Sequence, residues 1–427
     1  MVQDKFFLSS FVTGTALTIA LIVLTVVPLI AAEIRYPVSC YEGQELEKVR
    51  EWEKTWVGKK IDINNIDAVK EFVPDSMYQI IKNPGKWGEV WFEIVPYREI
   101  VPTPGTVELT KKYTGTVTVG PQGEIINWVS GTPFPEPKNG IEVAYNFDTV
   151  NMGDNMFAPQ DAYVVDGLMK YDRKFIMNVW NYWFYGRRDI PPVPEVLPNP
   201  KQIRKATTIS YEEPAALKGT RNLVIKWKDD MKDYGSWTFS SASRRIARRS
   251  TAQRMDSVGG GDNTSDDNLG WDWRISSQTY KLLGRKEILI ARHQDLKVLK
   301  KNHKEGYCVP TGLMNERVKA YEVETIHKDP NYIYSKQIWY IDPESWWIIY
   351  AEKYDRQGRP WKIQSMAQYL NKSKYNGIEV PMVGNMLTVD VQRVHSTYGA
   401  FYAVIGETGP QYRPDFYTPN SLQREGY

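Results

Sequence analysis

The segment from Tyr334 to Ile363 constrains the fold more than any other, because it reads as three β-strands joined by two tight turns. Asp342-Pro343-Glu344-Ser345 has Asp first and Pro second, as a type I turn prefers. Asp355-Arg356-Gln357-Gly358 supplies a Gly where the chain needs a positive φ. The segment therefore predicts consecutive antiparallel hairpins.

The middle strand of this segment is apolar on both faces. Alternation of side chains places Trp346, Ile348 and Tyr350 on one face and Trp347, Ile349 and Ala351 on the other. An antiparallel hairpin usually leaves one face to water, so a second layer must cover each face of this one. A sheet that curves around helices or an apolar ligand meets that requirement.

Composition supports a large, β-rich globular body. The chain has 427 residues, of which 42% are hydrophobic and 25% charged, as in a folded protein with a substantial core. Its 15 Trp and 27 Tyr favour strands over a helical bundle. The net charge of +3 is too small to indicate a nucleic-acid partner.

Strand patterns dominate the second half of the chain. Besides the three strands above, alternation and turn residues predict strands at Asn222–Lys228, Ser236–Phe239, Tyr280–Ile290, Arg317–His327 and Val383–His395. Their spacing favours a meander. A long segment without periodicity, residues 250–269, interrupts them and is expected to be a loop.

Residues 33–86 are expected to form a helical N-terminal arm. Apolar residues recur near helical spacing over Glu42–Trp56 and again over Ser76–Ile81. A cap at Asn64 or Asn65 and the terminating Pro74 indicate another short helix, which runs to Phe72, between them.

Residues 87–427 are expected to form the β domain. Alternation predicts strands over Trp87–Val101 and Lys111–Val119. An aromatic stripe over Ala162–Tyr185 predicts a long helix inserted into this domain. The Pro-rich segment Pro191–Pro200 is then an extended connector, either between two halves of the chain or within one sheet.

The N-terminal segment, residues 1–32, reads as an export signal. Phe6–Ala32 contains no charged residue, Lys5 supplies a weak positive start, and Leu29-Ile30-Ala31-Ala32 offers a cleavage site before Glu33. The alternative is an uncleaved inner-membrane anchor, because the apolar run is long enough to span a bilayer. Both interpretations place the rest of the protein outside the cytoplasm.

Cys40 and Cys308 are the only cysteines. In an exported chain they predict a single disulfide that clamps the N-terminal arm to the body, with two unpaired thiols as the alternative.

The sequence carries no recognisable catalytic motif. It has no P-loop, no G-x-S-x-G elbow, no H-E-x-x-H helix and no cysteine pair at metal-ligand spacing. Carboxylates are plentiful, but spacing singles out no pair for acid–base chemistry. We therefore expect no enzymatic activity, no catalytic residue, no metal and no cofactor. The four histidines are expected to be structural or solvent-facing: His293, His303, His327 and His395.

Two charged stretches have both a functional and a structural interpretation. Asp262–Asp267 offers oxygen atoms at alternate positions, but lacks the Gly and distal Glu of a calcium loop, so a solvated loop is favoured. Arg244, Arg245, Arg248 and Arg249 either pair with carboxylates across strands or hold an anionic group of a ligand.

The aromatic residues have the same two interpretations, because each is either part of the core or a contact to an apolar ligand. The candidate ligand contacts are Trp180, Trp183, Trp339, Trp346, Trp347 and Tyr350.

Several segments together resemble the family catalogued as domain of unknown function 1329. They are Gly235–Ser250 with Asp266-Asp267 and Tyr280–Ile290, the long segment Asn315–Lys362, and Tyr113–Pro137 with its Gly-x-Pro-Phe-Pro pattern. This resemblance implies exported relatives of the LolA and LolB lipoprotein-sorting factors. It implies an α+β fold that is mainly β: a large, curved antiparallel half-barrel with helices and an apolar cavity on its concave side.

The resemblance also implies a location and partners. Such proteins are expected in the periplasm or at the outer membrane, beside resistance-nodulation-division type transporters and outer-membrane barrel proteins. The leading hypothesis is a non-enzymatic envelope protein that binds a lipid or another hydrophobic small molecule and carries it between membranes or to a transporter. The alternatives are a structural or assembly protein that binds an outer-membrane partner or its own copies, and an envelope hydrolase with an unrecognised site.

Overall fold

The structure, a computed structural model, describes residues 36–167, 171–297 and 308–424. The signal or anchor predicted for residues 1–32 lies outside these ranges. None of the helices within them is both long enough and apolar enough to cross a membrane.

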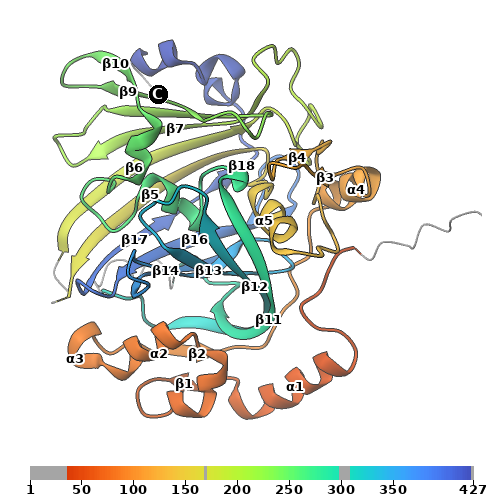
Figure 1. Cartoon of the computed structure of the whole chain (residues 1–427), viewed down its shortest axis with the longest axis vertical. Coiled ribbons are helices and arrows are strands. Elements are labelled where there is room, and N and C mark those ends of the chain that lie inside the picture. The colour runs from red at the N-terminus through yellow and green to blue at the C-terminus, as the bar shows by residue number, and fades with distance from the viewer. Residues whose placement is uncertain (1–35, 168–170, 298–307, 425–427) are drawn as a thin grey trace, which may run out of the picture. The chain divides into compact units, whose positions relative to one another are not determined.

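One large sheet organises this part of the chain (Figure 1). Its strands follow the order β1-β2-β12-β13-β14-β15-β16-β17-β5-β6-β7-β8-β9-β10, with β11 beside β12 and β18 beside β5. The sheet is antiparallel except where β2 runs parallel to β12. It stays open rather than closing on itself, which confirms the predicted mainly β, half-barrel architecture.

The strands of the large sheet are β1 (Lys60–Ile61), β2 (Phe92–Ile94), β5 (Asn155–Asp166), β6 (Tyr171–Trp183), β7 (Ile203–Glu213), β8 (Arg221–Trp227), β9 (Gly235–Ser240), β10 (Arg245–Arg248), β11 (Gln278–Ala291), β12 (Leu313–His327), β13 (Lys336–Ile341), β14 (Ile348–Tyr354), β15 (Pro360–Lys372), β16 (Glu379–Asp390), β17 (His395–Phe401) and β18 (Val404–Ile405). A small separate hairpin consists of β3 (Thr118–Val119) and β4 (Ile125–Ile126).

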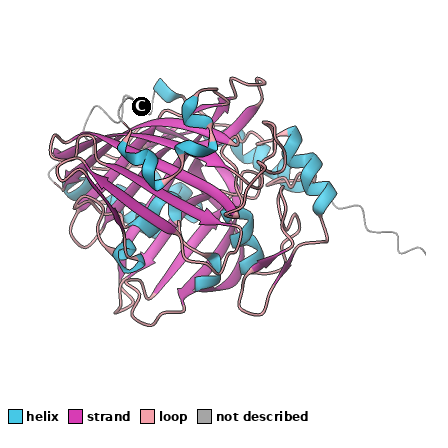
Figure 2. Cartoon of the chain, turned by 90° about the horizontal axis from the view of Figure 1, so that it is seen from above, coloured by secondary structure: helices cyan, strands magenta, loops and turns pink. Residues whose placement is uncertain are grey.

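The helices are short (Figure 2). The α-helices are α1 (Gln44–Trp56), α2 (Asp75–Lys82), α3 (Pro84–Trp87), α4 (Pro104–Tyr113) and α5 (Gly140–Asp148). The 3₁₀ helices are η1 (Ile66–Phe72), η2 (Thr251–Met255), η3 (Ser265–Gly270), η4 (Ile275–Ser277), η5 (Pro410–Tyr412), η6 (Pro414–Phe416) and η7 (Pro419–Gln423).

Opposite faces of β14 contact different layers, which answers why this strand is apolar on both sides. On one face, Tyr350 contacts α2, where its hydroxyl lies 2.7 Å from Ser76 Oγ. On the other face, Lys353 forms a buried ion pair with Asp267 of the loop between β10 and β11. We call this loop, residues 249–277, the inner loop, and we call the face that it covers the concave face.

Helix α5 and the inner loop lie on the concave face. The ring of Phe147, on α5, lies 6.1 Å from the ring of Trp339 and 6.4 Å from that of Trp347. Trp339 pairs with Ala351 across β13 and β14, so it shares the face of Lys353. Trp271 of the inner loop packs on Trp339 as well, at 5.9 Å between ring centroids.

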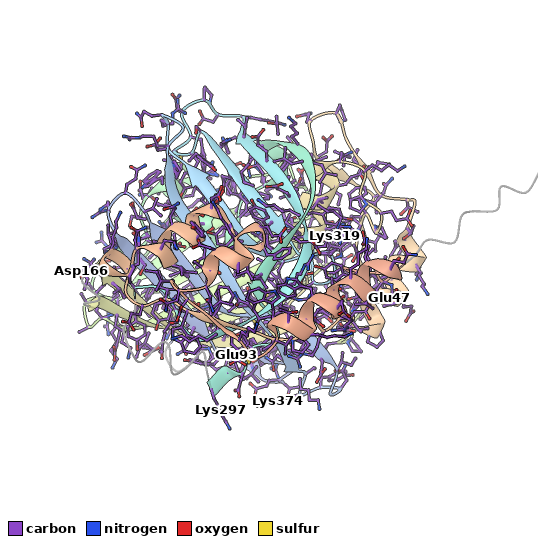
Figure 3. All side chains as sticks on the ribbon, turned by 90° about the horizontal axis from the view of Figure 1, so that it is seen from below. Glu47, Glu93, Asp166, Lys297, Lys319 and Lys374 are labelled. Carbon is purple, nitrogen blue, oxygen red and sulfur yellow. The ribbon has the colours of Figure 1, made fainter. Side chains whose placement is uncertain are left out.

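The N-terminal helices cover the opposite, convex face of the sheet near β11–β14 (Figure 3). Lys319 of β12 forms an ion pair of 2.6 Å with Glu45 at the start of α1. The guanidinium of Arg317 lies 5.1 Å from the ring centroid of Trp52 and 4.0 Å from that of Phe72. The helices of the predicted N-terminal arm therefore pack on the body.

The C-terminal segment covers the convex face of β6–β8. Trp180 stacks on Phe157 of β5 at 5.2 Å and meets Phe416 of η6 edge-on at 5.8 Å. Tyr182 stacks on Tyr417 at 5.4 Å. These rings form a core cluster that is separate from the main one.

The helix predicted over Ala162–Tyr185 is wrong, because this segment contains the end of β5 and all of β6, which pair as antiparallel strands. Aromatic residues occupy both faces of β6, and their density produced an apparent helical stripe. Since β6 and β7 are neighbours, the connector Pro191–Pro200 is a loop within one sheet rather than a domain linker.

The two strands predicted before residue 120 are also largely wrong. Of Trp87–Val101, only β2 is a strand, and Lys111–Val119 contains the end of α4 before β3 begins. Thr103 caps α4 by accepting a hydrogen bond of 3.2 Å from the Thr106 backbone, a local signal that outweighs the short alternating pattern.

Candidate functional site

A cavity of about 290 Å³ lies between the concave face of the sheet and the inner loop. Its size is near the lower end of the roughly 300–1,000 Å³ of small-molecule pockets. The sheet contributes alternate residues of β5, β6, β7 and β8, as expected where one face of each strand lines a space. The apolar and aromatic lining residues are Phe147, Val150, Met152, Met156, Ala158, Ala162, Val164, Phe175, Met177, Val179, Ile209, Tyr211, Val224, Val258, Leu269, Trp271, Trp347, Met382, Val383, Met386, Phe401 and Ala403.

Buried polar contacts hold the inner loop on the concave face. The carboxylate of Asp262 lies 2.8 Å from His395 Nδ1 and accepts a hydrogen bond of 2.7 Å from Thr397 Oγ1. Asp267 pairs with Lys353 and accepts a hydrogen bond of 2.9 Å from Tyr334. These partners belong to β13, β14 and β17 or the turns beside them, so the loop is anchored across several strands.

The contacts of these carboxylates with other side chains argue against a calcium site at Asp262–Asp267. Asp266 accepts a hydrogen bond of 2.8 Å from Tyr332 and lies 3.1 Å from the guanidinium of Arg254. The carboxylates point to hydroxyl groups and cations of the protein rather than to a common centre. The favoured alternative, a solvated loop, is equally wrong, because Asp262, Asp266 and Asp267 are buried.

Glycines allow the inner loop to approach the sheet closely. Gly259 has a φ of 61°, and a Cβ atom there would lie 2.6 Å from the ring of Phe175. A Cβ atom on Gly261 would lie 2.7 Å from Thr397 Oγ1. The Gly-Gly-Gly run therefore closes the cavity against β6 and β17.

Four charged side chains lie together at one end of the cavity: Lys205 of β7, Lys226 of β8, Asp148 of α5 and Asp272 of the inner loop. Arg249 also lines the cavity, near Tyr211 of β7. Lys226 Nζ lies 2.5 Å from Asp272, and Arg204 forms a bidentate pair with Asp148 at 2.6 and 3.1 Å. Burial, reinforced by the nearby charge of Lys226, lowers the pKa of Lys205 to about 7.

Only one of the six aromatic residues proposed from the sequence as ligand contacts, Trp347, lines this cavity. Trp180 packs under the C-terminal segment, and Trp183 packs with Trp128 beneath the small hairpin. Trp339 is fully buried beneath α5 and the inner loop.

The remaining two aromatic candidates lie elsewhere. Trp346 stacks on Tyr321 at 5.7 Å, and Tyr350 meets Tyr340 edge-on at 6.0 Å beside α2. The structure thus distributes the six side chains over both faces of the sheet rather than around one site.

The four arginines of the 244–249 segment do not share one site either. Of the four, only Arg249 lines the cavity. Arg244, Arg245 and Arg248 are exposed at the turn and the strand of β10, where Arg248 lies 6.0 Å from the ring centroid of Trp237.

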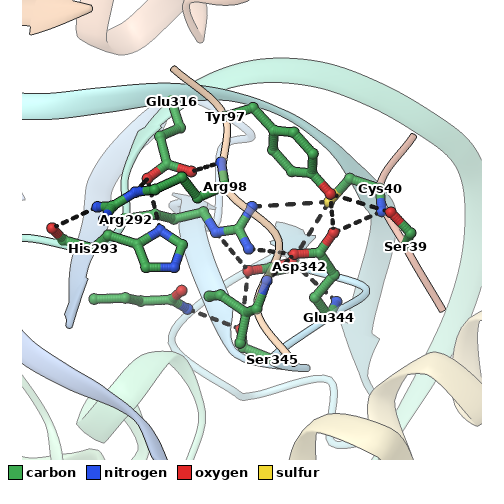
Figure 4. Close-up of polar contacts among 12 residues, drawn as sticks. Ser39, Cys40, Tyr97, Arg98, Arg292, His293, Glu316, Asp342, Glu344 and Ser345 are labelled. Atoms are coloured by element: carbon green, nitrogen blue, oxygen red, sulfur yellow. Dashed lines mark hydrogen bonds and ion pairs between the residues drawn. The ribbon is translucent and has the colours of Figure 1, made fainter. Parts of the chain in front are cut away.

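The predicted disulfide is wrong, because Cys40 and Cys308 are both free and buried. Cys308 hydrogen-bonds with Ser396 of β17, whereas Cys40 belongs to a buried network around Arg292 (Figure 4). The two cysteines therefore secure different segments to the body. Cys40 still attaches the N-terminal arm to the body, as expected, but through polar contacts instead of a disulfide.

Arg292 lies at the centre of that network. Its guanidinium contacts Glu344 and lies 3.3 Å from Asp342, both in the turn between β13 and β14. Glu344 in turn accepts hydrogen bonds of 2.8 Å from the backbones of Cys40 and Ile100. Cys40, Asp342 and Glu344 offer three ligand atoms within 4.8 Å, the spacing of a metal site, but Arg292 already supplies the positive charge there.

Comparison with known proteins identifies the family. The family model described as protein of unknown function (DUF1329) matches residues 60–423. The chain belongs to this family. The uncharacterized protein PA3922 of Pseudomonas aeruginosa is 24% identical over 348 residues, covering 76% of this chain and 72% of that protein.

Two solved structures are similar to this DUF1329 member. A DUF1329 family protein from Desulfovibrio piger has 15% identity and a TM-score of 0.46, covering 66% of this chain and 96% of its own. LolA superfamily protein NE2245 from Nitrosomonas europaea has 12% identity and a TM-score of 0.38, covering 66% of this chain and 100% of its own.

The residues that shape the cavity were missed in the sequence, apart from Trp347 and Arg249. The small and apolar residues at alternate positions of β5, Met156 to Val164, are a period-2 signal that the aromatic stripe obscured. Lys205 reads as a solvent-facing residue of a strand, and only the pairing of β7 with β8 shows that it opposes Lys226.

Proposed function

We propose that this DUF1329 protein is a non-enzymatic carrier of the cell envelope that binds a lipid or another hydrophobic small molecule in the concave cavity. The observation that carries the proposal is a preformed apolar space on one face of an open sheet, closed by a loop that buried ion pairs hold in place. Apolar pockets with a few convergent polar groups are the usual form of a ligand site.

The charged groups of the site support a binding role over catalysis. The carboxylates that line the cavity, Asp148 and Asp272, are engaged by Arg204 and Lys226. A glycosidase-type mechanism needs a pair of carboxyl groups facing a substrate across a shared space. Here each carboxylate neutralises a cation, which suits the wall of a binding site.

Native mass spectrometry of the protein purified from membranes of its source tests the proposal, together with solvent extraction of what it carries. We expect a hydrophobic molecule at close to one per chain. Ala162→Trp fills the cavity, whereas Ala247→Trp places the same ring at an exposed position of β10. We expect Ala162→Trp to lose most of the ligand and Ala247→Trp to retain it.

Two results would overturn the carrier proposal. One is wild-type protein that carries no hydrophobic molecule from its own membrane. The other is equal ligand retention in both tryptophan variants. A dominant protein partner captured by cross-linking in cells, without any lipid, would favour the structural or assembly role instead.

A further inference from the structure

Two lysines face each other across neighbouring strands on the wall of the cavity. Lys205 of β7 pairs directly with Lys226 of β8, and both side chains line the cavity. Directly opposed residues of antiparallel strands have Cβ atoms about 4.5–5.5 Å apart, and like charges in this position destabilise a sheet. An anion close to both side chains would offset this repulsion.

Only one of the two lysines, Lys226, forms direct ion pairs with carboxylates, whereas Asp272 and Asp148 attract Lys205 from a greater distance. Lys226 Nζ lies 2.5 Å from Asp272 and 4.0 Å from Asp148. Arg204 takes both oxygens of Asp148. Within the ranges that the structure describes, Lys205 forms no ion pair, and its ammonium group instead lies 5.4 Å from the ring centroid of Trp183.

The surroundings of Lys205 affect its pKa. Burial, followed by the proximity of Lys226, lowers the pKa of Lys205 to about 7 although Asp272 and Asp148 act to raise it, so the ammonium form is disfavoured unless a further anion lies nearby. An anion placed between the two lysines would attract both ammonium groups and raise the pKa of Lys205.

We propose that the ligand of this cavity carries an anionic head group, a carboxylate or a phosphate, which binds between the ammonium groups of Lys205 and Lys226. The inference rests on the proposed function and adds the chemical class and the orientation of the ligand. The head group accepts hydrogen bonds from both ammonium groups, and charge-assisted bonds of this kind are among the strong ones.

The rest of the cavity is mainly apolar, with Arg249 as the one further charged lining residue among those the structure describes, and it sets the direction of the apolar tail. Beyond Lys205, β7 presents Thr207, Ile209 and Tyr211 to the same space, and Val164 and Phe175 line it towards the far end of these strands. The six-residue step from Lys205 to Tyr211 is about 20 Å long at 3.3 Å per residue. An extended alkyl chain running along β7 matches this path.

Isothermal titration calorimetry of delipidated protein tests the inference with three probes of equal chain length, below their critical micelle concentrations. Hexadecanoic acid and hexadecyl phosphate carry an anion, and hexadecan-1-ol does not. We expect both anionic probes to bind at least about tenfold more tightly than the alcohol, the effect of one charge-assisted contact. The ratio between the two anions identifies the preferred group.

Lys205→Met removes the charge and keeps most of the length of the side chain. Lys201→Met is the control, because it removes an exposed lysine in the turn that precedes the same strand. Lys205→Met should abolish the preference for the anions while the affinity for the alcohol changes little. Lys201→Met should keep the preference.

The failures of the two proposals are distinguishable. If no probe binds to the wild-type protein, the carrier proposal fails. If the alcohol binds as tightly as the anions, or if Lys205→Met keeps the anion preference, the head-group inference fails and the carrier proposal stands.

Discussion

The guanidinium of Arg292 lies 3.3 Å from the carboxylate of Asp342 and also contacts Glu344, with all three side chains fully buried. Asp342 and Glu344 belong to the turn that the sequence shows most clearly, and Glu344 binds the backbones of Cys40 and Ile100. One cation therefore joins the β13–β14 turn, the end of β11 and the N-terminal segment.

Arg292→Met should lower the free energy of unfolding by about 3–5 kcal/mol, because it leaves two buried carboxylates without their counter-charge. Urea unfolding of the purified protein, followed by tryptophan fluorescence, measures the loss. Arg359→Ala is the control, since Arg359 is 65% exposed beside Asp355 and such a pair contributes less than about 1 kcal/mol. Equal losses in the two variants would contradict the structural role of Arg292.

Asp267→Asn should destabilise the protein at neutral pH by a similar amount, about 3–5 kcal/mol. Burial alone would raise the pKa of Asp267, but the ammonium groups of Lys353 and Lys362 outweigh it and the pKa lies below its ordinary value. The stability that a depressed carboxyl pKa provides is present at neutral pH, and it is lost as pH falls below about 4.

The difference between wild type and Asp267→Asn should therefore shrink steadily in unfolding experiments below that pH. Asp172→Asn, at an exposed pair with Arg173, is the control and should change stability little at any pH. A pH-independent difference for Asp267→Asn would show that packing, not charge, explains its effect.

The two cysteines should titrate as free but unreactive thiols. Burial raises the pKa of Cys308 to about 11, and burial together with Glu344 and Asp342 raises that of Cys40 well above its ordinary value. Since the thiolate is the reactive form, a maleimide at pH 8 should label the folded protein slowly. Both thiols should react after unfolding without a reductant. Labelling that requires a reductant would indicate the disulfide that the sequence suggested.

The hairpins of the second half were predictable because their information is local. Alternation over Trp361–Tyr369 and the turn at Gly358, whose φ is 76°, each depend on a few consecutive residues. The family resemblance then supplied the open curved sheet, which the strand order confirms.

The positions of the aromatic residues relative to the cavity were not predictable in this way. Trp180 and Val179 are neighbours on β6, yet one packs under the C-terminal segment and the other lines the cavity. The face of β6 that the C-terminal segment covers is identified by the contact of Trp180 with Phe416, which is more than 200 residues away in the chain. The same limit applied to Cys40, whose partner is Arg292 rather than Cys308.

A matched pair of tryptophan variants shows which face of the sheet binds the ligand. Trp347→Leu removes ring area from the cavity wall and should weaken ligand binding by roughly 1 kcal/mol, a factor of about five. Trp180→Leu removes a similar ring from the convex face and should lower stability without changing affinity. Calorimetric titration and urea unfolding of both variants check this. Weaker binding in Trp180→Leu alone would place the ligand on the convex face.

Ligand binding should depend on pH through Lys205. The charged groups around it are Lys226, Asp272, Arg204 and Asp148, and its pKa in the free protein is about 7. An anionic ligand binds the protonated lysine and raises its pKa, so affinity is full below about pH 7 and falls as pH rises, by up to tenfold per unit. Titrations with hexadecane-1-sulfonate, whose charge is constant between pH 6 and 9, measure this slope.

Lys205→Met is the control for this dependence and should give a flat profile, because Lys226 keeps its charge through Asp272 and Asp148. A slope that persists in Lys205→Met would assign the proton to another group of the site. A flat profile in the wild-type protein would contradict a contact between the head group and Lys205 with its pKa of about 7.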